Sequence, residues 1–270
     1  MKCIDFHTHV FPDAIAARAM ASLEKEGGEK AFLDGTLASL RRSMAQTGID
    51  HAVIASIATR PEQFDPMLKW SQAIRADDII PFLSVHPRDP RMLERIRNIK
   101  EEGFKGIKLH PYYQDFVLDD ALMFPAYEAM EEAGLVLLVH TGFDMAFERD
   151  RRCDPRKIVN VMTRFPSLKL VTTHCGAWED WDEVETHLLG RPVYMDISYS
   201  IGKMGQERFR RFLNTHPSDY LVFGTDSPWA DQQTALADAE RAITDPQRLA
   251  NLLFRNAVRL LGIPDVRVVS

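Results

Sequence analysis

The chain has 270 residues, of which 45% are hydrophobic and 27% are charged, a balance typical of a globular protein with a substantial core. Its 39 acidic and 33 basic residues give a formal net charge of −6, which argues against a general nucleic-acid binder because such proteins normally need a basic face. Neither a signal-like segment nor an apolar run of about eighteen residues is visible, so no membrane span is expected. Three cysteines without C-x-x-C spacing favour a reduced, cytoplasmic compartment.

Short apolar runs rich in β-branched residues alternate along the chain with longer segments of helical period. They predict strands at 2–6, 49–57, 79–85, 104–109, 135–139, 168–173, 193–197 and 221–225. Helices are clearest at 89–102, 120–133, 155–164 and 206–214, and a last helix at 246–261 carries an apolar stripe suited to docking on a core. This alternation predicts an α/β fold, a single (β/α)8 TIM-type barrel domain over residues 1–270, although a doubly wound open sheet would alternate in the same way.

The segment between Phe11 and Gly48 is longer than the other crossovers. We predict two helices there, at 13–25 and 36–47, with a turn at Gly27-Gly28 between them. In a barrel this inserted helical segment, which follows the first strand, would lie near the mouth and could cover the site.

Polar residues that suit catalysis follow several of the apolar runs. Each of them stands just where a predicted strand stops: His7, His110, His140, His174 and Asp226. In a (β/α)8 barrel the carboxyl ends of the strands meet at one rim, and catalytic groups gather there. The positions therefore favour the barrel over the open sheet.

The strongest local signal is Asp5-Phe6-His7-Thr8-His9. Side chains alternate along a strand, so His7 and His9 point the same way and form a pair of imidazoles suited to zinc, iron, manganese or nickel. Alone, an H-x-H pair is equally compatible with ordinary polar residues in a turn.

Together, the rim residues predict a metal site. We assign His7, His9 and His140 as metal ligands and Asp226 as a ligand that also acts as a base. His174 is assigned as an acid/base partner that does not bind the metal. Asp196 and Ser198 end the strand 193–197 on one face, where they either reach the site or make structural hydrogen bonds.

These residues also resemble a known group of proteins. The chain is similar to the amidohydrolase superfamily, in particular to the amidohydrolase-related family that includes aminocarboxymuconate-semialdehyde decarboxylase and aromatic-acid decarboxylases. The similarity extends from Asp5 to Gly262 and rests on these motifs: Asp5-x-His7-x-His9, Gly106-Ile107-Lys108-Leu109-His110-Pro111, His140, His174, Gly224-Thr225-Asp226 and Asn256-Ala257-x-x-Leu260-Leu261-Gly262.

The resemblance implies a distorted barrel, a divalent metal and either hydrolysis or non-oxidative decarboxylation. It also implies that a carbamylated Lys108 could bridge a second metal, although a lysine here more often binds a substrate carboxylate or forms a buried ion pair. We expect one ion rather than two, with Zn²⁺ favoured. His110 is either a second-metal ligand, a substrate contact or a capped histidine.

Substrate contacts are expected from the strand ends and the loops that follow them. The substrate-binding candidates are Arg60, Lys108, His110 and Tyr113. Further loop candidates are Tyr112, Phe143, Arg151, Arg152, Trp178 and Trp229. Arginine and lysine would pair with a carboxylate, and aromatic rings would stack on a flat substrate.

Three functions are compatible with this pattern. The leading one is a metal-dependent hydrolase that uses activated water to cleave an amide, lactone or ester-like bond of a small, carboxylated substrate. The alternative is a metal-dependent decarboxylase, a lyase acting on a small aromatic or enol carboxylic acid. A non-catalytic binding protein that keeps the barrel and the metal has the least support, because all the polar residues assigned to catalysis are present. We expect a small-molecule partner, neither nucleic acid nor membrane, and, from the resemblance, a homodimer.

Overall fold

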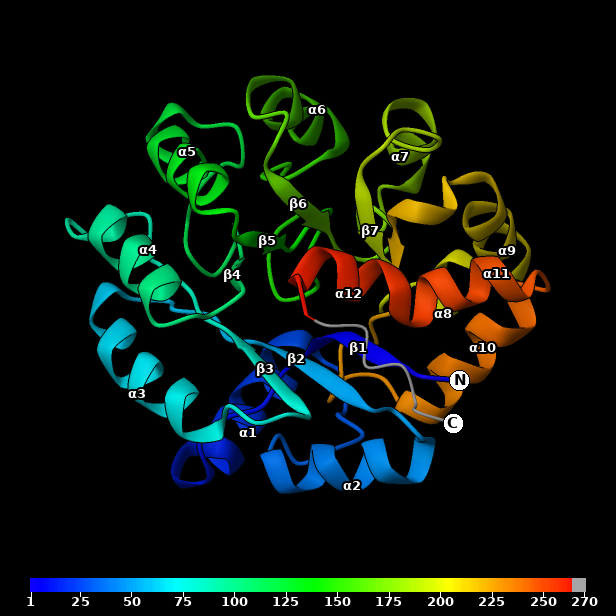
Figure 1. The fold of residues 1–270 in the computed structure, drawn as a ribbon, viewed down its shortest axis with the longest axis horizontal. Helices are drawn as coiled ribbons and strands as arrows, with labels where there is room; N and C mark the ends of the chain where they lie inside the picture. The colour runs from blue at the N-terminus through cyan, green and yellow to red at the C-terminus, as the bar shows by residue number, and fades with distance from the viewer. Residues whose placement is uncertain (264–270) are drawn as a thin grey trace.

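The computed structural model describes residues 1–263, and this part of the chain contains eight short strands. In chain order they are β1 (Ile4–Thr8), β2 (His51–Ala55), β3 (Ile79–Phe82), β4 (Gly106–Leu109), β5 (Val136–Val139), β6 (Lys169–Thr172), β7 (Tyr194–Asp196) and β8 (Leu221–Val222). β1 to β3 form one parallel sheet and β4 to β8 another, and each strand pairs with its neighbours in sequence. Figure 1 shows the strands at the centre of the molecule and the helices around them.

Backbone hydrogen bonds join the two sheets at both seams. Between β3 and β4, the Lys108 N–H donates to the Leu83 carbonyl at 2.7 Å. Between β8 and β1, the Phe6 N–H donates to the Phe223 carbonyl, also at 2.7 Å. The strands therefore form a closed ring, and the predicted (β/α)8 barrel is confirmed.

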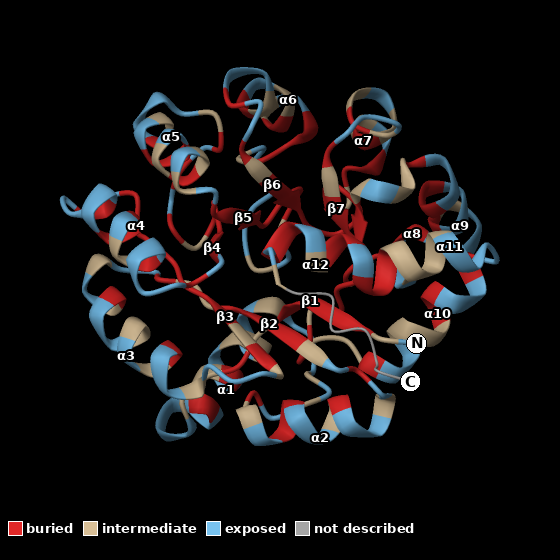
Figure 2. Ribbon diagram, viewed as in Figure 1, coloured by how far each residue is buried: buried red, intermediate tan, exposed pale blue. Residues whose placement is uncertain are grey.

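Helices connect the strands on the outside of the ring. They are α1 (Asp13–Gly27), α2 (Leu37–Thr47), η1 (Pro61–Gln63), α3 (Phe64–Ile74), α4 (Met92–Glu101), η2 (Ala121–Met123), α5 (Phe124–Ala133), α6 (Pro155–Arg164), α7 (Trp181–His187), α8 (Ile201–Met204), α9 (Gln206–Thr215), η3 (Ser218–Tyr220) and α10 (Gln232–Ala242). The side chains of Thr36, Asp154 and Asp231 cap α2, α6 and α10 by accepting bonds from first-turn N–H groups. Figure 2 shows that the helices bury the faces turned to the strands and expose the others.

The last helical segment closes one end of the barrel. It consists of α11 (Pro246–Ala250), a π-helical turn η4 (Asn251–Arg255) and α12 (Asn256–Leu261), and it matches the predicted helix at 246–261. Phe254, Ala257 and Leu260 pack with Phe6 and other inward-facing strand residues in one apolar cluster. In Figure 1, α12 crosses the front of the ring. This end is therefore filled with apolar side chains, and the polar strand ends lie at the opposite end.

An irregularity in β1 sets the direction of its side chains. Asp5 is opposite Ala52 and Thr8 is opposite Ile54, so two residues of β1, Phe6 and His7, face the single residue Val53. Such a β-bulge re-aims the side chains that follow it. It explains how Phe6 enters the apolar barrel interior while His7, the next residue, takes part in a polar cluster.

The predicted element boundaries need correction at several strands. β1 begins and ends two residues later than the predicted 2–6, β2 is shorter than 49–57, and β8 ends at Val222 rather than at 225. In these places apolar residues continue into the loops that carry the site. The inserted segment does form two helices, α1 and α2, with Gly28 at a positive φ of 69° in the turn.

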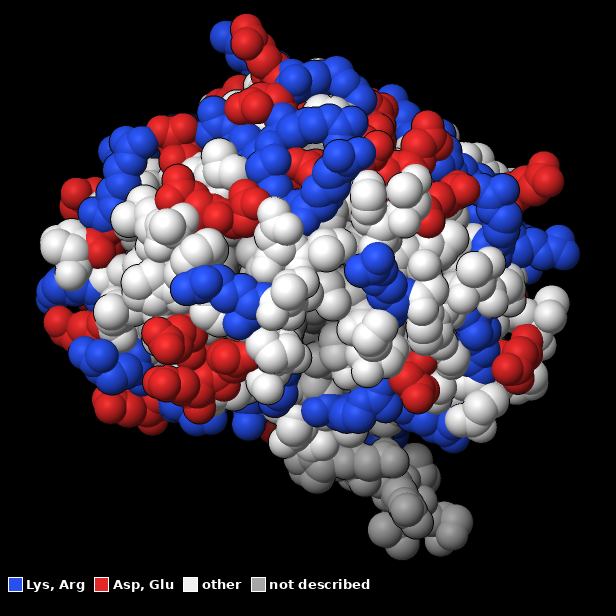
Figure 3. Space-filling view, turned by 90° about the horizontal axis from the view of Figure 1, so that it is seen from above, with Lys and Arg blue, Asp and Glu red and all other residues white. Residues whose placement is uncertain are grey.

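The predicted domain covers residues 1–270, of which 264–270 lie outside the described residues. Among residues 1–263, no helix is both long and apolar enough to cross a membrane. On the face shown in Figure 3, Lys and Arg side chains are intermixed with Asp and Glu side chains.

Candidate active site

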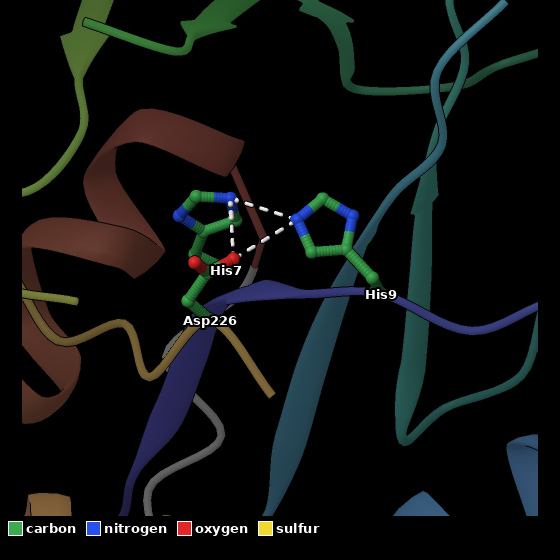
Figure 4. A group of neighbouring side chains, drawn as sticks. All are labelled: His7, His9 and Asp226. Atoms are coloured by element: carbon green, nitrogen blue, oxygen red, sulfur yellow. Dashed lines mark hydrogen bonds and ion pairs between the residues drawn. The ribbon is translucent and has the colours of Figure 1, made fainter. Parts of the chain in front are cut away.

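Three of the predicted metal ligands come together where β1 ends and β8 passes into its loop. The Nε2 atoms of His7 and His9 are 3.1 Å apart, and Oδ1 of Asp226 lies 3.4 Å from the first and 3.1 Å from the second. Figure 4 shows the two rings and the carboxylate turned toward one another. The Asp226 N–H also donates to the His7 carbonyl at 2.8 Å, which ties the β8 loop to β1.

Hydrogen bonds to the other ring nitrogens orient both imidazoles. Nδ1 of His7 lies 2.8 Å from Oδ2 of Asp196, and Nδ1 of His9 lies 2.8 Å from the carbonyl oxygen of Ala55. Both partners are acceptors, so each Nδ1 carries the proton and each Nε2 presents its lone pair. Metal-binding histidines are oriented in the same way, by a carboxylate or carbonyl on the far side of the ring.

The donor set of this cluster fits a divalent cation. Zinc binds His nitrogen and Asp oxygen at about 2.0–2.2 Å, which places tetrahedral ligand atoms about 3.4 Å apart. The measured separations of 3.1 and 3.4 Å match that spacing. Burial would raise the pKa of Asp226, but the neighbouring His7 and His9 outweigh it and hold this pKa below its ordinary value. The cluster thus presents two imidazole nitrogens and one carboxylate oxygen toward a common point, as a cation site requires.

Lys108 supplies a cationic group beside this cluster. It lies on β4, is 1% exposed, and its Nζ is 3.1 Å from Nε2 of His7. Burial lowers the pKa of Lys108 to about 8. The same burial lowers the pKa of His7 well below its ordinary value.

His140 lies in a second group, together with His110 and Asp144. The rings of His110 and His140 are stacked at 4.2 Å, and Nε2 of His110 is 3.4 Å from Oδ2 of Asp144. Nε2 of His140 lies 3.0 Å from the Phe143 carbonyl, and His110 and His140 hold the pKa of Asp144 below its ordinary value even though burial opposes this. His140 as a fourth ligand stays a prediction, because its ring nitrogens are engaged outside the His7 cluster.

His174 links the two groups. Its Nε2 is 3.2 Å from Nδ1 of His140, and its Nδ1 is 3.0 Å from Oγ of Ser198. The Asp196 carboxylate accepts from the Ser198 Oγ–H at 2.6 Å and from the His174 N–H at 2.9 Å, in addition to its contact with His7. Asp196 and Ser198 therefore do reach the site, and Asp196 is its structural hub.

Backbone conformation at the site is also unusual. Asp226 and His174 are non-glycine residues with positive φ, 67° and 57°. A residue held there costs about 1–3 kcal/mol and persists only where its surroundings fix it. Here the surroundings include the buried Asp5, whose carboxylate accepts from the Thr225 N–H and Oγ1–H, next to Asp226, at 3.0 and 2.6 Å. Burial raises the pKa of Asp5 to about 6.

A cavity of about 500 Å³ opens above both groups. Of the predicted substrate-binding residues, Lys108, His110 and Tyr113 line this cavity, and so do the loop candidates Phe143, Trp178 and Trp229. Arg60 does not: it is exposed and precedes η1, outside the lining. Tyr112, Arg151 and Arg152 are likewise absent from the lining.

Two contributions to the site were not predicted from the sequence. Asp144 stands in the loop after β5, four residues beyond His140, and no strand end marks it. The helix α3, which follows β2 and η1, places Met67 and Trp70 in the cavity wall. The inserted helix α1 also lines the cavity, in agreement with the predicted position of the insertion near the mouth of the barrel.

Comparison with known proteins identifies the family. The amidohydrolase family model matches residues 4–263. The chain belongs to the amidohydrolase family. It is accordingly an enzyme of the amidohydrolase superfamily, a metal-dependent family, and its His/Asp groups fit a divalent metal.

The curated relatives found by sequence match only part of this chain. A dihydroorotase from Marinobacter nauticus is 31% identical over 124 residues, 43% of this chain and 36% of that protein. A dihydroorotase from Azotobacter vinelandii is 26% identical over 192 residues, 67% of this chain and 51% of that protein. The match thus spans about half or less of the length of these relatives.

Solved structures share the fold over nearly the whole chain. An uncharacterised TIM-barrel protein from Bordetella bronchiseptica has a TM-score of 0.75 at 19% identity, covering 97% of this chain and 99% of that one. A 5-carboxyvanillate decarboxylase from Novosphingobium aromaticivorans was solved in complex with manganese and 4-hydroxy-3-methoxy-5-nitrobenzoic acid. It has a TM-score of 0.72 at 16% sequence identity, and the match covers 97% of this chain and 96% of that one. A probable 2-pyrone-4,6-dicarboxylic acid hydrolase from Acinetobacter baumannii has a TM-score of 0.68 at 15% sequence identity, and the match covers 97% of this chain and 100% of that one.

Proposed function

We propose that this enzyme is a metal-dependent hydrolase that cleaves an amide, lactone or ester-like bond of a small molecule. The observation that carries this proposal is the position of the Asp226 carboxylate. Asp226 and His9 are 14% and 15% exposed and both line the cavity, whereas His7 is 1% exposed. Water and a substrate can therefore reach the ligand cluster from the side of Asp226.

The chain's own groups divide the hydrolytic work among them. A divalent cation held by His7, His9 and Asp226 supplies a Lewis acid that lowers the pKa of water and polarises a carbonyl. Asp226, ionised at neutral pH, accepts the proton that the attacking water loses. Lys108 pairs with negative charge on the substrate, and His174 donates a hydrogen bond or a proton to the leaving atom.

We propose Zn²⁺ as the ion, because two imidazoles and one carboxylate form a ligand set that zinc commonly takes in catalytic sites. The manganese in the structurally similar 5-carboxyvanillate decarboxylase makes Mn²⁺ the second ion to test. Metal analysis of the purified protein, followed by reconstitution of the stripped protein with each ion, decides between them. Recovery of activity with Mn²⁺ but not with Zn²⁺ would overturn the choice of zinc.

A specific observation favours decarboxylation as the second candidate. The cavity walls are largely apolar, and the buried Lys108 could hold a substrate carboxylate next to the metal cluster. An environment that excludes water around a carboxylate favours loss of carbon dioxide, because the negative charge, which passes to the carbon left behind, is spread over more atoms as the C–C bond breaks than it is in the carboxylate. In that reaction His174 would protonate the carbon that loses the carboxylate.

An isotope experiment separates the two reactions. The zinc- or manganese-loaded protein is incubated in H2¹⁸O with a panel of lactones, amides, aryl esters and aromatic carboxylates. Hydrolysis places one ¹⁸O atom in the product carboxylate, which mass spectrometry detects. Release of carbon dioxide from an aromatic carboxylate, without ¹⁸O in the organic product, overturns the hydrolase proposal in favour of the lyase.

A further inference from the structure

The helix α1 presents apolar side chains to the cavity as well as to the protein core. Ile15, Ala19 and Leu23, spaced four residues apart on one face of α1, line the cavity. Ala16 and Met20, on the adjacent face, are the buried residues that pack the helix onto the protein. Ile15 remains 39% exposed. Ala19 and Leu23 are half-buried, so this apolar face is partly open, and a ligand that covers it buries further apolar surface.

The rest of the cavity wall is also largely apolar. Met67 and Trp70 of α3 line the cavity, as do Trp178 and Trp229 from the loops after β6 and β8. The volume of about 500 Å³ lies within the range of about 300–1,000 Å³ that small-molecule sites occupy. The space therefore suits a ligand with an extended apolar body.

Charge in the cavity is uneven from floor to wall. Lys108, beside the His7 cluster, is the single lysine or arginine among the described residues that line it. Three acidic residues line it as well: Asp144 and Asp226 belong to the two groups at the floor, whereas Glu29, in the loop after α1, is exposed. One negative charge is accommodated at the floor beside Lys108, and a second one farther out meets Glu29 without a lysine or arginine among the described lining residues to compensate.

We propose that the cavity binds a monocarboxylate whose single anionic group lies at Lys108 and whose apolar tail, an aryl or acyl chain, runs along α1. This inference rests on the proposed function only in taking the metal cluster as the reacting end. It names the substrate class as singly charged and apolar. It excludes dicarboxylates, and with them the substrate class that the name of the Acinetobacter hydrolase describes.

Binding of unreactive carboxylates tests the proposal without turnover. The metal-loaded protein is titrated with benzoate and with its 4-methyl, 4-propyl and 4-pentyl derivatives, by calorimetry and by the fluorescence of the cavity tryptophans. Each methylene buried along α1 should tighten binding about three- to fourfold. Terephthalate, which carries a carboxylate in place of the 4-methyl group, should bind at least about tenfold more weakly than 4-methylbenzoate.

Two matched variants locate the tail. Ala19→Phe fills the α1 wall and should abolish the gain from the propyl and pentyl groups while leaving the Kd of benzoate within about twofold. Ala17→Phe, at an exposed position of the same helix outside the lining, should leave the whole series unchanged. Circular dichroism melting curves of both variants show whether either change unfolds α1.

The results separate this inference from the proposed function. Affinity that does not depend on tail length, terephthalate binding as tight as 4-methylbenzoate, or equal effects of Ala19→Phe and Ala17→Phe would each overturn the inference, even if esters are hydrolysed. Tail-dependent binding that Ala19→Phe abolishes would support it, even if the ¹⁸O experiment refutes hydrolysis.

Discussion

Oδ2 of Asp196 lies 2.8 Å from Nδ1 of His7, and both side chains are buried to 1% exposure or less. The carboxylate fixes the imidazole as the tautomer that carries its proton on Nδ1. Nε2 is then free to face His9 and Asp226. Asp196 also accepts from His174 and Ser198, so one acid at the end of β7 orients groups on both sides of the cluster.

Asp196→Asn should weaken metal binding about 10- to 100-fold, because the amide can present its NH2 group to His7 Nδ1 and favour the wrong tautomer. The measurement is the Zn²⁺ dissociation constant by competition with a chromophoric chelator at pH 7. Asp180→Asn is the matched control, since Asp180 is also buried near the rim but pairs with Arg151 instead. An unchanged dissociation constant for Asp196→Asn would contradict the orienting role.

His9→Ala should remove metal and activity together, because His9 contributes one of the three atoms that surround the cation position. His174→Ala should lose activity but keep most of its metal. Metal content is measured by elemental analysis after dialysis, and activity on the best ester of the panel. Equal metal loss in the two variants would show that His174 is a ligand.

Gly106→Ala should destabilise the barrel by about 1–3 kcal/mol, the usual cost of overpacking a core. A Cβ at this position of β4 would lie 2.4 Å from two ring atoms of Phe82 inside the barrel. Urea unfolding gives the free energy of unfolding. Gly202→Ala is the control, because nothing lies within 4 Å of its Cβ position, and it should change stability by no more than about 1 kcal/mol. Similar losses in both variants would contradict the packing argument.

His216 should make stability depend on pH. Burial lowers its pKa from the usual 6.5 to about 4, while its Nε2 donates to the Val193 carbonyl at 2.8 Å. Below pH 6.5 the unfolded chain takes up a proton that the folded chain does not, so the free energy of unfolding falls as pH drops from 6.5 toward 4. The His216 contribution to this fall is about 3 kcal/mol.

The comparison is between the wild-type chain and His216→Gln, which keeps an N–H donor but does not titrate. The difference in their free energies of unfolding should be constant above pH 7 and should shift in favour of the variant between pH 6.5 and 4. Parallel stability curves over that range would show that His216 does not stay neutral in the fold.

The sequence predicted the ring and much of its rim because both depend on local pattern. Apolar runs predicted the strands, the polar residues at the ends of those runs included His7 and Asp226, and the H-x-H spacing added His9 to the predicted cluster. Strand ends were less accurate, since apolar residues such as Phe223 continue into loops. Pattern alone also could not reveal the bulge in β1, because an extra residue changes side-chain direction only relative to the partner strand.

Loop residues were predicted less reliably for a different reason: Tyr113, Phe143, Trp178 and Trp229 line the cavity, but Arg60, Tyr112, Arg151 and Arg152 do not. The direction of a loop side chain depends on tertiary contacts rather than on periodicity. Arg60 precedes a 3₁₀ turn and stays outside the cavity, whereas Asp144, four residues after His140, turns back toward His110. The engagement of His140 with His174 and Phe143 is likewise set by ring rotation, which no sequence spacing encodes.

The β8–β1 seam has a consequence for how the protein assembles. Asp5 and Thr225, whose hydrogen bonds join β1 to the loop after β8, are 220 positions apart. Of the proposed cation ligands, His7 and His9 come early in the chain and Asp226 more than 200 positions later, so a refolding chain has no complete ligand set before β1 and the β8 loop meet. Capture of a spectroscopic ion such as Co²⁺ during refolding would therefore time ring closure itself.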